Sequence, residues 1–215
     1  MDELKQNLLF IGQGTLLTLE LLAGGMLIGI LLGTILAILR YNGMAKLLIN
    51  RFVSIIRGTP LILQLSFIYF AVPGLLGLRL DIVVAGILTF GLNSSAYIAE
   101  ILRSGIENLP KGQFEAAKTL QIPTFYLWKD IILPQVIKNI LPALINEMIA
   151  LLKETALIST IGGMDLMRKA QSIAAEQFTY FLPLCIAGCY YYGLVLLIEY
   201  LGKKIEQGGH DAVHQ

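Results

Sequence analysis

Long apolar stretches separated by short polar segments dominate this chain. Charge-free stretches cover residues 21–39, 58–78, 82–99 and 177–198, and a fifth at 131–152 is interrupted only by Lys138 and Glu147. A helix satisfies its own backbone hydrogen bonds in hydrocarbon, and about 20 apolar residues are needed to cross it. The pattern therefore predicts an all-α membrane protein with about five transmembrane helices, which we place at residues 12–40, 56–74, 82–106, 131–153 and 179–202.

Short loops and the absence of a long linker favour one transmembrane domain over residues 1–215, with a core at about 12–203. The polar residues 204–215 are expected to form a mobile tail. Gly24, Gly25, Gly29 and Gly33 in the first span give the small-residue spacing that suits close helix packing, which we expect within the chain.

Composition agrees with a membrane protein and excludes several other classes. Of 215 residues, 56% are hydrophobic and 14% charged, against about 25% charged in soluble domains. A net charge of +1 gives no reason to expect a nucleic-acid partner. The chain has no phosphate-binding Gly-x-x-x-x-Gly-Lys motif and no nucleophile–base pair, so it is not expected to be an enzyme or to carry a cofactor.

Two pairs of potential metal ligands share a spacing of four residues. Cys185 and Cys189 lie in an apolar run, and His210 and His214 lie in the polar tail. Structural metal sites need closed sets of four ligands, so the sequence predicts no metal site.

The distribution of basic residues predicts the orientation of the spans. Most of the 16 lysines and arginines fall on the face that holds residues 40–57, 103–138 and 203–204. Because cytoplasmic loops carry the excess of basic residues, this face is expected to be cytoplasmic. Five spans then place the N-terminus outside and the C-terminus inside.

A polar segment between the third and fourth spans is a candidate contact surface. Residues 113–120 are good helix formers, and Glu115 lies in the early turns, where a carboxylate favours the helix dipole. Ala116 and Ala117 remove bulk from one face, so another surface can approach closely. Pro123 disfavours helical backbone at the residue before it. An ordinary amphipathic connector is the alternative.

Several strings along the chain resemble permeases of type I ABC importers for polar amino acids. They are RGTPL at 57–61, AYIAEILRSGI at 96–106, GQFEAA at 112–117, a Leu-Pro pair eighteen residues after Glu115, and LLKETAL at 151–157. The resemblance implies a cytoplasmic EAA coupling helix, with Glu115, Ala116, Ala117 and Gln121 as the residues that couple to an ATPase. The family usually has glycine where this chain has Gln121.

The resemblance also implies the partners and the location. They are an ATP-binding cassette subunit that holds ATP and Mg, a second permease copy or similar chain, an extracytoplasmic substrate-binding protein, an amino-acid substrate and the lipid bilayer. The protein would be a multi-pass component of the bacterial cytoplasmic (inner) membrane.

Ionisable residues within spans are costly and therefore indicate function. Glu100, Glu147 and Lys153 are the candidate substrate-binding residues, and Asn93, Tyr97 and Gln64 are weaker ones. Two carboxylates against one lysine favour amino acids with cationic or amide side chains. Alternatively, Glu100 pairs with Arg103, and Lys153 pairs with a carboxylate across a permease dimer.

Two other classes of function remain open from the sequence. An ion- or proton-coupled secondary amino-acid transporter could use Glu100 and Glu147 as its ion sites, although such carriers usually show paired repeats. A purely structural membrane subunit would not need Glu147 or Lys153 for transport.

Overall fold

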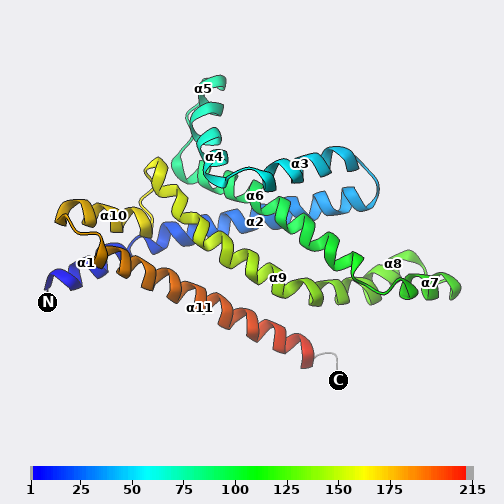
Figure 1. Cartoon of the computed structure of the whole chain (residues 1–215). Helices are drawn as coiled ribbons and strands as arrows, with labels where there is room; N and C mark the ends of the chain where they lie inside the picture. Colours follow the sequence, from blue (N-terminus) through cyan, green and yellow to red (C-terminus); the bar gives the residue numbers. More distant parts are fainter. Residues whose placement is uncertain (1, 212–215) are drawn as a thin grey trace.

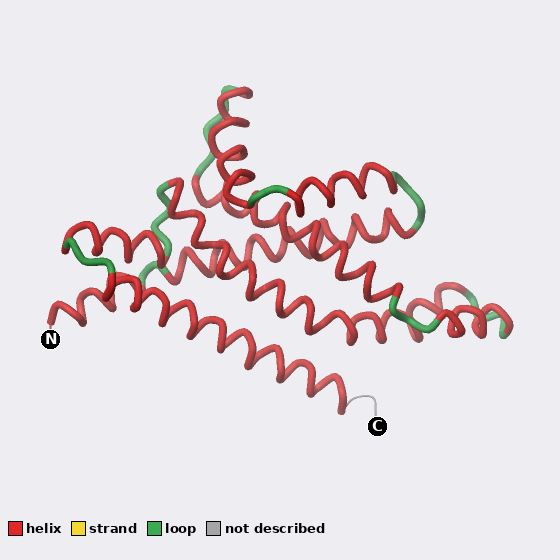
Figure 2. The backbone as a smooth tube through the Cα atoms, in the orientation of Figure 1, coloured by secondary structure: helices red, strands yellow, loops and turns green. Residues whose placement is uncertain are grey.

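The computed structural model describes residues 2–211, and the regular elements among them are all helical (Figure 1, Figure 2). The first half comprises α1 (Asp2–Gly12), α2 (Thr15–Tyr41), α3 (Lys46–Gly58), α4 (Leu61–Ser66), a π-helical turn η1 (Phe67–Ala71), α5 (Val72–Leu76) and α6 (Ile82–Glu107). The second half comprises α7 (Lys111–Thr119), α8 (Thr124–Tyr126), a π-helical turn η2 (Leu127–Ile132), α9 (Leu133–Glu154), a 3₁₀ turn η3 (Thr155–Ile161), α10 (Leu166–Gln177) and α11 (Phe181–Asp211).

Within residues 2–211, four helical stretches are long and apolar enough to cross a membrane: Asp2–Tyr41, Ile82–Glu107, Thr124–Ile161 and Phe181–Gln207. A fifth crossing exists if the bent pair Lys46–Gly58 and Leu61–Leu76 counts as one span. The predicted all-helical membrane fold is therefore confirmed, with four or five spans. The expected tail is helical as far as Asp211, while His214 lies outside the described residues.

The second predicted span, at 56–74, begins too early. The chain turns by 104° between α3 and α4, so residues 56–58 end one helix and do not begin the next. Thr59 is extended, as expected before proline, and Pro60 precedes the first residue of α4. The amide nitrogen of Gln64 donates to Ile56 O at 2.8 Å and to Thr59 Oγ1 at 2.9 Å. Gln64 therefore holds the bend.

Helices α2 and α6 run in the same direction and pack with their backbones close together. A Cβ atom added at Gly29 would lie 2.7 Å from the Ser94 Cβ, and one at Gly33 would lie 2.8 Å from the Ser95 carbonyl oxygen. In α6, the missing side chain of Gly91 leaves room for the Ile28 side chain of α2. The expected small-residue packing within the chain is confirmed.

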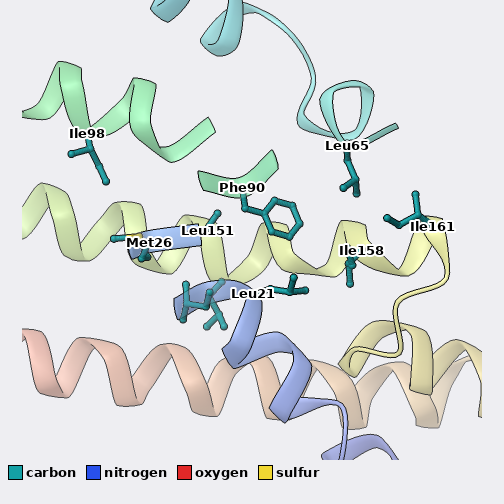
Figure 3. Packing of buried hydrophobic residues seen from close by; sticks show 10 residues of the cluster. Leu21, Met26, Leu65, Phe90, Ile98, Leu151, Ile158 and Ile161 are labelled. Atoms are coloured by element: carbon teal, nitrogen blue, oxygen red, sulfur yellow. The ribbon is translucent and has the colours of Figure 1, made fainter. Parts of the chain in front are cut away.

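The largest hydrophobic cluster joins these two helices to α9, η3 and α4 (Figure 3). Phe90 and Ile98 of α6 and Leu151 of α9 are almost fully buried in it. Leu65 reaches it from α4, which attaches the first turn of the bent segment to the bundle. The buried members of this cluster are Leu21, Leu22, Met26, Leu65, Phe90, Ile98, Leu151, Leu152, Ile158 and Ile161, and Figure 3 labels all of them except Leu22 and Leu152.

A buried carboxylate joins α10 and α11 at the end of the molecule that holds the N-terminus (Figure 1). Asp165 accepts hydrogen bonds from the Arg168 backbone N–H and the Tyr191 hydroxyl, each at 2.9 Å. Burial raises the pKa of the Asp165 carboxyl. Gly14 contacts the same backbone, because a Cβ there would lie 2.5 Å from the Asp165 carbonyl carbon.

We predict that Gly33→Ala destabilises the protein by about 1–3 kcal/mol, since the added methyl group would overlap the Ser95 carbonyl oxygen. The matched control is Gly188→Ala in α11, where an added Cβ meets nothing within 4 Å. Thermal unfolding in detergent measures both variants. Equal unfolding temperatures for the two would refute close α2–α6 packing.

Candidate functional site

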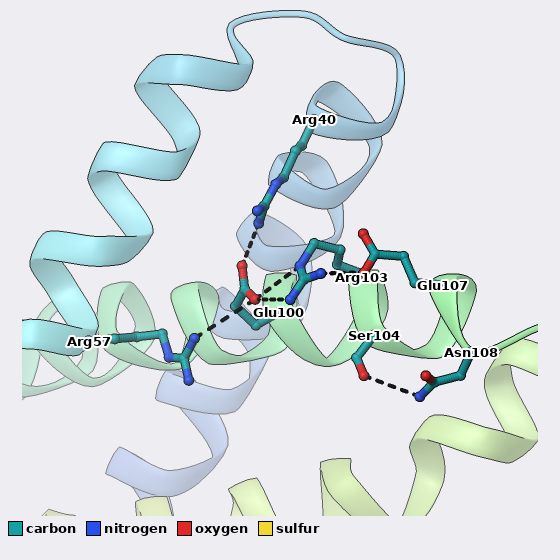
Figure 4. A network of polar contacts seen from close by, with 7 residues as sticks. All are labelled: Arg40, Arg57, Glu100, Arg103, Ser104, Glu107 and Asn108. Atoms are coloured by element: carbon teal, nitrogen blue, oxygen red, sulfur yellow. Dashed lines mark hydrogen bonds and ion pairs between the residues drawn. The ribbon is translucent and has the colours of Figure 1, made fainter.

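Glu100 of α6 is the centre of a cluster of charged side chains (Figure 4). Arg40, at the end of α2, donates a charged hydrogen bond to its Oε1. Arg103 donates to Oε2 from Nε at 3.0 Å and from Nη2 at 2.7 Å. Arg57 of α3 lies further off, with Nη1 at 3.8 Å from Oε2. One carboxylate therefore interacts with three guanidinium groups.

Helix geometry and helix packing bring these groups together. Glu100 and Arg103 are three residues apart on α6, and Arg103 and Glu107 four apart, so they lie on one face and pair. Helices α2 and α6 lie side by side and run in the same direction. Arg40 is two helical turns beyond Gly33 on α2, and this position brings it to Glu100. The expected alternative, a Glu100–Arg103 pair, is present.

The charges in this cluster are not balanced. Arg40, Arg57 and Arg103 oppose Glu100 and Glu107, which leaves one formal positive charge in excess. The side chain of Arg57 is 44% exposed, against 18% for Arg40 and 36% for Arg103. Arg57 also lies over the ring of Tyr97, 5.1 Å from its centroid. Arg57 is therefore the guanidinium that an anionic ligand can reach most easily.

Two polar cavities meet at this cluster, and Arg57, Tyr97 and Glu100 line both of them. One has a volume of about 520 Å³ and extends to Asn139 of α9; the other has about 470 Å³ and extends to Asn50 of α3. These volumes are in the range of small-molecule sites.

One wall of the second cavity has an unused hydrogen-bond acceptor. Asn50 Oδ1 is buried and has no hydrogen-bond partner among the described residues. A buried acceptor without a donor is costly, and this atom has almost no exposed surface of its own.

Glu147 lies one helical turn beyond the wall of the first cavity. Asn139 and Ala143 line that cavity from α9, and Glu147 continues the same face at a spacing of four residues. Its Oε1 accepts a hydrogen bond from Ser94 Oγ at 2.5 Å, and Arg57 is close enough to interact with it electrostatically. Glu147 makes no ion pair within the part of the chain that the structure describes.

The other predicted substrate residues lie elsewhere. Lys153 is exposed and does not line either cavity. Asn93 is buried in α6, and Gln64 holds the bend between α3 and α4. Sequence reasoning missed Arg40 and Arg57, although both are basic residues at the ends of apolar stretches and Arg57 opens the RGTPL string.

The polar segment forms α7 and lies at the opposite end of the molecule from α1 and α10 (Figure 1). Glu115 and Ala116 are exposed, whereas Ala117 is 3% exposed and packs within the chain. Gln121 has φ of +54°, the left-handed conformation that glycine favours. The exit from this helix therefore has the backbone geometry of a glycine turn.

The fold and the cavities define a helical membrane protein with charged hollows between its helices. Residues 29–208 match the family described as binding-protein-dependent transport system inner membrane component. The chain belongs to this family and is a transport permease component.

Named relatives and a solved structure agree with this assignment. A GlnP permease of Rickettsia typhi, named for glutamine transport, is 49% identical over 94% of this chain and 93% of its own length. The arginine transport system permease protein ArtQ of Bacillus subtilis is 42% identical over 92% and 91%. The crystal structure of an amino acid ABC transporter with histidines matches with a TM-score of 0.86 and 38% identity, over 92% of this chain and 93% of that one.

We predict that Arg40→Gln and Glu100→Gln each destabilise the protein by about 1–3 kcal/mol, since each removes the charged hydrogen bond between two mostly buried side chains. The double variant is expected to lose less than the sum, because it removes both charges. Arg79→Gln, an exposed arginine outside the described ion pairs, is the control. Strict additivity in thermal unfolding would show that the two residues do not interact.

Proposed function

We propose that this chain is the permease subunit of an ATP-driven importer for polar amino acids. Membership of the family and the names of the relatives support the transport role. The observation that carries the proposal is the pair of charged cavities that meet at Glu100. The chain acts beside a second permease copy or similar chain, a separate ATPase and an external substrate-binding protein.

The cavities have the groups needed to bind both ends of an amino acid. Arg57 is exposed and extends a guanidinium fork, which can pair with the α-carboxylate. Glu147, one helical turn beyond the wall of the first cavity, is the proposed acceptor for the ammonium group or for a cationic or amide side chain. Glu100 is already paired with two arginines. Of the two carboxylates that the sequence suggested for binding a cationic or amide side chain, Glu147 is therefore the one we assign to this role.

Helix α7 is the proposed contact for the ATPase. Glu115 and Ala116 face outward there, and Ala117 fixes the helix to the rest of the chain. Lys111, Lys118 and Lys129 surround this end, which favours a cytoplasmic location and an external N-terminus. ATP and Mg are bound by the partner ATPase, whose closure moves α7 and switches the spans between outward and inward states.

The alternatives from the sequence have less support. An ion-coupled carrier would not belong to a binding-protein-dependent family, so the match over residues 29–208 argues against it. A purely structural subunit has no need of two polar cavities lined by charged groups.

We predict that Glu115→Lys abolishes co-purification of the ATPase and reduces uptake at least about tenfold, because it reverses a charge at the contact. The amount of permease in the membrane should not change. Glu3→Lys, an exposed charge reversal on α1 at the opposite end, should leave both unchanged. Normal co-purification with Glu115→Lys would exclude α7 as the docking helix.

We predict that Glu147→Gln reduces arginine uptake about tenfold and glutamine uptake much less, since only the cationic side chain needs the negative charge. Competition of radiolabelled substrates in proteoliposomes measures the ratio, and Glu3→Gln serves as the control. An equal loss for both amino acids would show that Glu147 does not select for charge.

A further inference from the structure

A third hollow lies on the other side of the Glu100 cluster from the two polar cavities. It has a volume of about 360 Å³, and its polar lining consists of Arg40, Lys46, Arg103 and Glu107. An apolar hollow of about 220 Å³ adjoins it, lined by Ala37, Ile38, Tyr41, Asn42, Ile106 and Trp128. The two share Ala37, Tyr41 and Ile106, so a basic and an apolar compartment lie side by side.

A tight turn builds the basic compartment. Gly43 has φ of +75° and Ala45 has φ of +48°, which reverses the chain at the end of α2. The turn starts α3 at Lys46 and brings its ammonium group to the same hollow as Arg40. Tyr41 and Trp128 meet edge to face, with ring centroids 5.0 Å apart, and form a wall of the apolar compartment.

The charges of this site favour an anion. Arg40 and Arg103 are already engaged with Glu100 and Glu107. Lys46 is exposed and takes part in no ion pair among the residues that the structure describes. The hollow therefore has one ammonium group free for a ligand, next to the edges of two guanidinium groups.

The position along the spans favours a lipid over a soluble anion. The site lies where the stretches Asp2–Tyr41 and Ile82–Glu107 end. Tyrosine and tryptophan are typical of the membrane–water boundary, and basic pockets between helices there bind acidic head groups. A soluble phosphate would fill only the basic compartment, whereas a phospholipid would fill both.

We propose that this hollow binds one anionic phospholipid. Its phosphate lies between Lys46 and the guanidinium edges of Arg40 and Arg103, and an acyl chain lies along Ala37, Ile38 and Trp128. A zwitterionic lipid would bring a second cation next to Lys46 and would bind less well. The proposal requires only the location in a membrane and does not rest on the transported substrate.

Native mass spectrometry of the purified full-length protein, together with the subunits that co-purify, tests the proposal. Phosphatidylglycerol, phosphatidylcholine and soluble glycerol 3-phosphate are the three probes. The variant Lys46→Gln removes the free ammonium, and Lys203→Gln, an exposed lysine on α11, is the matched control. Thermal unfolding of both variants checks that each is folded.

We expect phosphatidylglycerol to bind about fivefold more tightly than phosphatidylcholine, and Lys46→Gln but not Lys203→Gln to remove this preference. Glycerol 3-phosphate at the same concentration should not displace the lipid. Equal binding of the two lipids, or an unchanged preference in Lys46→Gln, would overturn the proposal. Displacement by glycerol 3-phosphate would also overturn it, because it would show a soluble-anion site.

Discussion

The close contact between α2 and α6 is the interaction on which the rest of this structure depends. Lipid tails are as apolar as leucine, so helices in a membrane gain little by burying apolar side chains and must pack closely instead. Gly29 and Gly33 permit this approach, and the parallel register that results carries Arg40 to the level of Glu100. A bulky residue in this contact would separate the helices and also the charges. The packing of small residues therefore determines the position of the functional cluster.

The Glu100 cluster separates two kinds of hollow. On one side, Arg57 and Tyr97 line the cavities proposed for an amino acid, and on the other Lys46 lines the site proposed for a lipid. Arg40 and Arg103 are partly shared between these sides, because each lines one of the polar cavities and also the basic hollow. Their ion pairs with Glu100 neutralise charge that would be costly in a membrane. Each side therefore keeps one cation for a ligand: Arg57 in the polar cavities and Lys46 in the basic hollow.

Local sequence signals predicted the elements better than their relations in space. The apolar runs predicted the spans because each run encodes its own helix, but they did not separate α3 from α4, between which the chain turns by 104°. Glu100 was found as a costly charge, whereas its partner Arg40 is 60 residues away, so only tertiary packing reveals the pair. Lys153 is exposed and lines neither polar cavity, so its role in substrate binding stays a prediction; spacing along one helix does not show which face meets α6. Gln121 takes the left-handed conformation of the glycine it replaces, a backbone property that the residue type alone does not predict.

The mass of the intact complex tests most directly whether this chain is the membrane half of an ATP-driven pump. The chain would be tagged, extracted in mild detergent and weighed by native mass spectrometry together with everything that co-purifies. We expect a mass equal to two permease chains and two ATPase subunits, which would also show whether both permeases are this 215-residue chain. A single chain, or an assembly of this chain alone without an ATPase, would contradict it.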